Sequence, residues 1–171
     1  AFAQKKSIDG FMDIPFGSDS ATVKSIIAAK GGVKDNTSYK DHLVFTGLSL
    51  SNRKVLILSV KFVDNKAYEA IFGFNEFAES DALNYYDIFS KDIAAVYGKG
   101  DMSNNFGNSS NSLRIKRLKS GNVFCKTLWQ SKNKNTILLQ FAPIDQSIYI
   151  ELTYQSDDLW DLNASKRRSD L

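Results

Sequence analysis

The feature that most constrains the fold is a set of short segments in which apolar and polar residues alternate. In 55–63 and 67–74 every second residue is apolar, and only Asp64-Asn65 separates the two segments. This alternation is typical of β-strands with one buried face, and Asp-Asn favours a tight hairpin because both residues tolerate positive φ. An earlier segment, 42–50, alternates too, but its phase changes at Gly47, which predicts a β-bulge. Together they predict an antiparallel meander.

A second series of alternating segments lies later in the chain, at 113–118, 123–130, 136–141 and 148–155. Short runs of Gly, Asn and Ser separate these segments, and such residues favour turns. They predict a second meander.

Helix signals precede each series. Before the first, Ser18-Asp19-Ser20 offers capping groups and Gly31-Gly32 offers a helix end. Before the second, apolar residues at helical spacing predict a helix over 81–97, capped by Ser80 and ended by Gly98.

These elements predict an α+β fold. A helix followed by an antiparallel meander is weakly repeated twice, with the helices packed on one face of the sheet. We interpret 4–171 as a single domain, which divides into halves at 11–76 and 77–171, and 157–168 as a short terminal helix.

Composition narrows the function classes. Hydrophobic residues make up 43% and charged residues 24%, which argues against intrinsic disorder. A net charge of +3 is too small for a dedicated nucleic-acid binder. No apolar run reaches the roughly 18–20 residues of a membrane-spanning helix. One cysteine and one histidine exclude an internal disulfide and a Cys- or His-rich metal site, so we expect no metal and no cofactor.

The first residues resemble the end of a signal peptide. Ala1-Phe2-Ala3 has the small-x-small pattern of a cleavage site, so the mature chain is predicted to begin at Gln4. This predicts a secreted protein in the periplasm or outside the cell. The alternative is an ordinary domain start.

No residue set forms a convincing catalytic or metal site. His42 and Cys125 are the pair to test for nucleophilic chemistry, but the strand pattern around Cys125 favours a buried, inert thiol. Asp157, Asp158 and Asp161 surround Trp160 without a calcium-loop pattern, and acids at a helix start explain them better.

The candidate partner-binding residues lie in the second half, and they are Phe106, Met102, Arg114, Lys116 and Trp129. Met102 and Phe106 interrupt a polar loop at 98–112, where an apolar side chain either contacts a partner or tucks onto the core, the outcome we expect for Phe106. Alternation would place Arg114 and Lys116 on one face of a strand. That face would contact an anionic partner or keep an exposed edge soluble.

A family resemblance rests on a short pattern. The segment Ile14-Pro15-Phe16-Gly17-Ser18, then a helix, Gly31-Gly32 and a meander, resembles exported α+β modules. Examples are β-lactamase inhibitory protein and the small lipoprotein of the outer-membrane barrel-assembly machine. The helix end at Tyr97-Gly98 and the strand of Trp129 are similar to secreted proteins of Bacteroidetes. No functional residue carries over, and the lipidated cysteine of the lipoprotein is missing.

These observations favour an exported, non-enzymatic binding or interaction module whose ligand is a protein or a small molecule. The alternative is an envelope-associated enzyme, or an enzyme inhibitor, acting through loop carboxylates.

Overall fold

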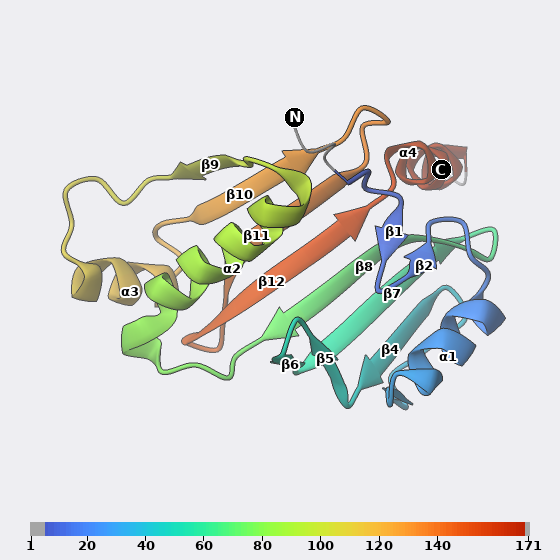
Figure 1. Ribbon diagram of the computed structural model, residues 1–171, viewed down its shortest axis with the longest axis horizontal. Helices are drawn as coiled ribbons and strands as arrows, with labels where there is room; N and C mark the ends of the chain where they lie inside the picture. The colour runs from blue at the N-terminus through green and yellow to red at the C-terminus, as the bar shows by residue number, and fades with distance from the viewer. Residues whose placement is uncertain (1–5, 170–171) are drawn as a thin grey trace.

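The computed structural model describes residues 6–169, and its main feature is a curved antiparallel sheet (Figure 1). The strands lie in the spatial order β3 (Val33–Lys34), β4 (His42–Thr46), β7 (Ile57–Val63), β8 (Lys66–Phe74), β12 (Ser147–Gln155), β11 (Thr136–Ile144), β10 (Cys125–Gln130) and β9 (Asp101–Asn104). The helices are α1 (Ser20–Ala29), α2 (Ala82–Tyr97), α3 (Asn111–Lys119) and α4 (Asp157–Ser169), with a 3₁₀ turn at Glu79–Asp81. Two small hairpins are formed by β1 (Gly10–Phe11) with β2 (Ile14–Pro15), and by β5 (Leu48–Leu50) with β6 (Arg53–Val55).

The order of elements repeats about the centre of the sheet. Helix α1 precedes β3, β4, β7 and β8, and helix α2 precedes β9, β10, β11 and β12. Strands β8 and β12 pair at the centre, whereas β3 and β9 lie at opposite edges. The predicted α+β fold with a repeated helix and meander is confirmed.

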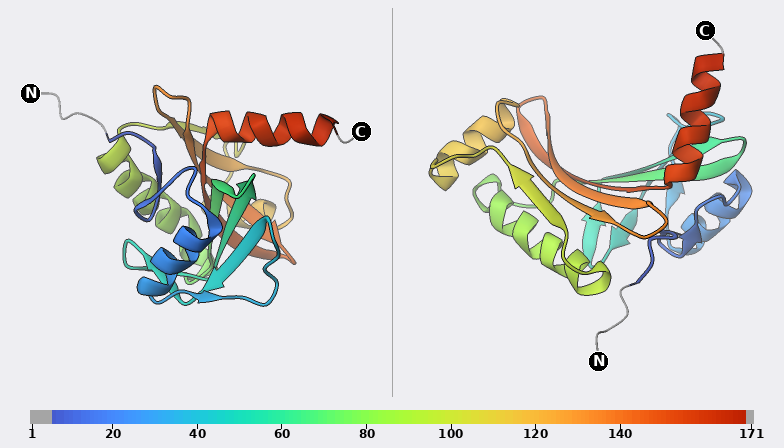
Figure 2. Two further views of the ribbon diagram at one scale, coloured as in Figure 1. Left: turned by 90° about the vertical axis from the view of Figure 1, so that its right-hand side faces the viewer. Right: turned by 90° about the horizontal axis from the view of Figure 1, so that it is seen from above.

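Helices α1 and α2 lie on the same side of the sheet, and α4 projects from the opposite side (Figure 2). We call the side under α1 and α2 the helix-covered face and the other the open face. The helix-covered face carries the apolar core, which includes Leu58, Phe72, Leu152 and Leu139, all fully buried. Among the described residues, no helix has both the length and the apolar character needed to cross a membrane.

Local signals explain the helix ends. Asp19, rather than Ser18 or Ser20, caps α1, because its carboxylate accepts a hydrogen bond of 2.7 Å from the Thr22 amide. The left-handed conformation of Gly31, with φ of 86°, lets the chain turn back after the helix. In α2 the apolar spacing predicts a buried stripe of Ala82, Tyr86, Phe89, Ile93 and Val96; the first four are buried, but Val96 is 46% exposed.

The first meander contains the predicted hairpin but not the predicted bulge. Asp64 and Asn65 both have positive φ and form the predicted tight hairpin. At Gly47, however, the chain does not form a bulge within one long strand. Gly47 has a φ of 78°, and the chain leaves the main sheet there to form the separate β5–β6 hairpin.

A bulge occurs instead where β7 pairs with β8. Lys61 is opposite Glu69, but Phe62 is opposite Ala67, so Tyr68 is an extra residue on β8. The alternation in 67–74 predicts that Tyr68 shares a face with Ala70; this is wrong, because a bulge turns two consecutive side chains to one side.

The predicted strand at 113–118 is also wrong. This segment belongs to α3, which Ser110 caps by accepting a hydrogen bond from the Leu113 amide. Leu118 is buried and Ile115 is partly buried. The side chains that face the core are therefore three residues apart, as in a helix, and not two apart, as in a strand. The loop predicted at 98–112 is shorter than expected, because it contains β9.

A candidate binding face on the sheet

The open face carries a row of side chains that crosses six strands. Each residue of this apolar row is directly opposite the next one in the strand register: Val44, Ser59, Ile71, Thr153, Leu138 and Leu128. Val44 is buried, the middle members are half-buried and Leu128 is 38% exposed. The open face of an antiparallel sheet is ordinarily polar, so four aliphatic side chains in one row are unusual.

Polar rows lie on both sides of the apolar row. Two residues away along each strand in one direction lies the first polar row: His42, Lys61, Glu69, Gln155, Thr136 and Gln130. In the other direction, from β12 to β9, lies the second polar row: Glu151, Gln140, Lys126 and Ser103. On β8 and β7 the same row continues with Gly73 and the exposed Ile57. An apolar centre with a polar rim is the usual arrangement of a protein–protein interface.

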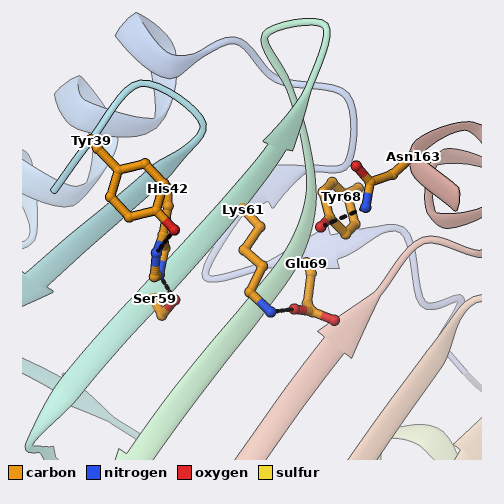
Figure 3. Close-up of polar contacts among 7 residues, drawn as sticks. All are labelled: Tyr39, His42, Ser59, Lys61, Tyr68, Glu69 and Asn163. Atoms are coloured by element: carbon orange, nitrogen blue, oxygen red, sulfur yellow. Dashed lines mark hydrogen bonds and ion pairs between the residues drawn. The ribbon is translucent and has the colours of Figure 1, made fainter. Parts of the chain in front are cut away.

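His42 is held in the first polar row by two hydrogen bonds (Figure 3). Its Nδ1 lies 2.9 Å from the Tyr39 hydroxyl, and its Nε2 contacts the Ser59 hydroxyl closely. Partial burial, and then the positive charge of Lys61, lower the pKa of His42 below its ordinary value. The neutral ring satisfies both contacts when one nitrogen donates and the other accepts.

Two strands from His42, beyond Lys61, the bulge places Tyr68 and Glu69 side by side on the open face. The Lys61 ammonium lies 2.5 Å from Glu69 Oε1 (Figure 3). The Tyr68 hydroxyl accepts a hydrogen bond of 3.1 Å from Asn163 of α4, and the Tyr68 ring packs 5.9 Å from the Trp160 ring. Trp160 therefore docks on the sheet through Tyr68.

The Ser59–His42 pair has the residue types of a nucleophile and its base, but not the backbone geometry. The Phe62 amide donates to the Asp41 carbonyl, and the alternation of the antiparallel ladder then directs the Ser59 amide toward β8. An acyl-transfer site needs backbone amides aimed at the developing oxyanion. Since the Ser59 amide belongs to the ladder, we interpret this pair as a polar anchor.

Cys125 lies on the opposite side of the sheet from His42 and forms no pair with it. Its thiol is buried next to the Tyr86 hydroxyl, and burial raises the pKa of Cys125 to about 11. Such a thiol is almost entirely protonated near neutral pH, so it is a poor nucleophile.

The structure separates the candidate binding residues that the sequence suggested. Phe106 is 5% exposed and packs in the core, so it tucks in as expected, whereas Met102 on β9 is 59% exposed. Trp129 is 3% exposed on the helix-covered face, where its indole donates a hydrogen bond of 2.8 Å to the Gly98 carbonyl.

The two basic candidates belong to a helix rather than a strand. Arg114 extends over the Phe106 ring, at 5.3 Å from its centroid, so its guanidinium packs against the preceding loop. Lys116 on the same helix is exposed. Neither residue lies on the sheet, so these candidates and the apolar row form no single site.

The carboxylates proposed for the alternative function do not converge. Asp13 pairs with Lys30 at 2.9 Å, and this partner holds the pKa of Asp13 below its usual value. Asp157 and Asp158 begin α4. Within residues 6–169, no three or more His, Cys, Asp or Glu side chains are grouped so that they could hold a metal ion.

A cleft of about 780 Å³ lies on the helix-covered side, between the β1–β2 hairpin and α2. Its floor includes Phe11, Phe89 and Leu152, and its charged rim includes Asp13 and Asp92. Both acids are already paired, Asp13 with Lys30 and Asp92 with Arg53. These two acids are therefore already engaged with cations of the chain itself, and neither is free to fix a small ligand.

Comparison of the chain with protein-family models, curated proteins and solved structures found no match. The candidate face therefore depends on the geometry described above.

Proposed function

We propose that this protein is an exported, non-enzymatic binding module whose partner is a protein seated on the open face of the sheet. The observation that supports this proposal is the apolar row between two polar rows. The row crosses six strands, which corresponds to about 24 Å at the usual strand spacing. A standard interface of about 800 Å² per partner has a similar width.

The partner that fits this face has an apolar ridge bordered by polar residues. Leu128 and the half-buried Leu138 would lie under the ridge, and polar side chains such as Lys126 and Gln155 would form the rim. Export remains part of the proposal because of the cleavage pattern at Ala1-Phe2-Ala3, which lies outside the described residues.

Site-specific photo-crosslinking tests the proposal. A photoreactive phenylalanine analogue replaces Leu128 on the open face in one variant and Ile88 on α2 in a matched variant. Both native side chains are similarly exposed, at 38% and 46%. In extracts of the native host, one discrete adduct is expected from Leu128 and not from Ile88. Equal labelling from both positions, or labelling from Ile88 alone, would refute the open face as the binding surface.

A further inference from the structure

Glu69 differs from every other carboxylate that takes part in an ion pair in residues 6–169. Its side chain is 6% exposed, whereas the acidic partners in the other six ion pairs are 49–81% exposed. Water can solvate those exposed carboxylates, but it has little access to Glu69. The residue nevertheless lies on the open face, in the first polar row.

The Glu69 carboxylate has unused capacity to accept hydrogen bonds. Lys61 Nζ is near Oε1, but this buried oxygen accepts no hydrogen bond of ordinary geometry. An ionised carboxylate has about four acceptor positions. Figure 3 shows the second oxygen pointing away from Lys61. A desolvated anion with one partner is costly, and an additional donor would offset part of that cost.

The geometry points to Glu69 as the acceptor for an arginine side chain of the partner protein, bound on the open face beside Tyr68 and Trp160. This inference rests on the proposed function, because it assumes that the partner covers this face. A guanidinium fits better than an ammonium for two reasons. Its planar fork donates two parallel hydrogen bonds to one carboxylate, and its face stacks on aromatic rings.

The surroundings of Glu69 supply both features. Tyr68 is next to it on the bulge, and the Trp160 ring, 38% exposed, packs against Tyr68. Lys61 is the competitor for the carboxylate. Its side chain is 35% exposed on a flexible stem, so it can move aside when a guanidinium arrives.

The test uses the complete chain and Nα-acetyl-arginine amide as the probe, so it needs no partner protein. The indole N–H resonances of the two tryptophans in a nitrogen–proton correlation spectrum report binding. Trp160 is near the site, whereas Trp129 is buried on the other face and is the internal reference. We expect a saturable shift of the Trp160 signal and none of the Trp129 signal. Nα-acetyl-lysine amide should bind more weakly.

Two substitutions should change the affinity in opposite directions. Glu69→Gln should weaken arginine binding about tenfold, because the charge-assisted acceptor is lost. Lys61→Gln should strengthen it, because the competing ammonium is gone. The matched control is Glu151→Gln, which alters another carboxylate of the open face, one that accepts a hydrogen bond from Gln140. It should leave the affinity unchanged.

The inference is overturned if the Trp160 signal does not move, if the lysine probe binds as well as the arginine probe, or if Glu69→Gln and Glu151→Gln behave alike. An unchanged or weaker affinity in Lys61→Gln would also overturn it. If the arginine probe does not bind but Leu128 still crosslinks to a partner, only this inference is refuted. If the arginine probe binds but Leu128 forms no crosslink, only the proposed function is refuted.

Discussion

Tyr68 and Glu69 are consecutive in the chain, yet their side chains lie on the same face of the sheet. The bulge opposite Lys61 causes this arrangement, because Tyr68 has no separate residue opposite it on β7. Tyr68 then contacts α4, while Glu69 meets Lys61. One backbone irregularity therefore brings the anchor of the terminal helix, Tyr68, onto the same face as the buried carboxylate of Glu69.

Tyr68→Ala should strongly destabilise the protein. The side chain is 2% exposed and contacts both Trp160 and Asn163, so its loss should cost about 3–5 kcal/mol. Urea denaturation measures the change. The control is Tyr39→Ala, where the side chain is 64% exposed and the expected cost is below about 1 kcal/mol. Equal costs would contradict the anchoring role of Tyr68.

Phe106→Ala should also lower stability, by about 3–5 kcal/mol, because the ring is 5% exposed and lies in the core. Met102→Ala is the matched change in the same part of the chain, and its 59% exposed side chain should contribute little. The melting temperatures of both variants, measured by thermal unfolding, show whether the Phe106 ring belongs to the core. A stable Phe106→Ala variant would mean that the ring is not part of the core.

Cys125 should react slowly with thiol reagents in the folded protein. Burial raises its pKa to about 11, so little thiolate exists at pH 8. The rate of reaction with a chromogenic disulfide, measured with and without denaturant, tests this. Denaturant should accelerate the reaction greatly. A folded protein that reacts as fast as the unfolded chain would show that the thiol is accessible.

His42 should make stability depend on pH. Because its folded pKa lies below the ordinary value of 6.5, the unfolded state takes up a proton first as the pH falls. Stability from this group is therefore present above pH 6.5 and is lost as the solution is acidified below it. The Tyr39 and Ser59 hydroxyls contact the ring, whereas Lys61 and Glu69 act on it through their charges.

His42→Gln isolates this effect. The free energy of unfolding, measured from pH 7.5 to pH 5, should fall less steeply in the variant than in the parent protein. Identical slopes would show that the ring titrates alike in both states.

Local patterns in the sequence predict much of the fold. Alternation in 55–63 and 67–74, and the positive φ that Asp64 and Asn65 tolerate, are properties of short segments, and the structure follows them. The segment at 113–118 resembles a strand because Leu113 and Ile115 alternate with polar residues. Ser110, three residues before Leu113, was the available sign of a helix start.

The candidate binding face cannot be predicted from the sequence, because strand register produces it. Ile71 and Leu138 look like interruptions of alternating strands, and only pairing through Thr153 brings them into one row. A usable signal existed in runs such as Ile137-Leu138-Leu139, since consecutive apolar residues in a strand indicate burial on both faces. The bulge at Tyr68 had no comparable signal, because Tyr68, Ala70, Phe72 and Phe74 form one series of apolar residues at every second position.

The central claim is that the open face binds the partner, and the affinity of one pair of variants tests it most directly. With the protein that crosslinks at Leu128, isothermal titration compares the parent chain with Leu128→Glu and with Ile88→Glu. Leu128→Glu should weaken binding at least about tenfold, because it places a charge in the apolar row. Ile88→Glu should bind like the parent. Equal affinity of Leu128→Glu and the parent would contradict the claim.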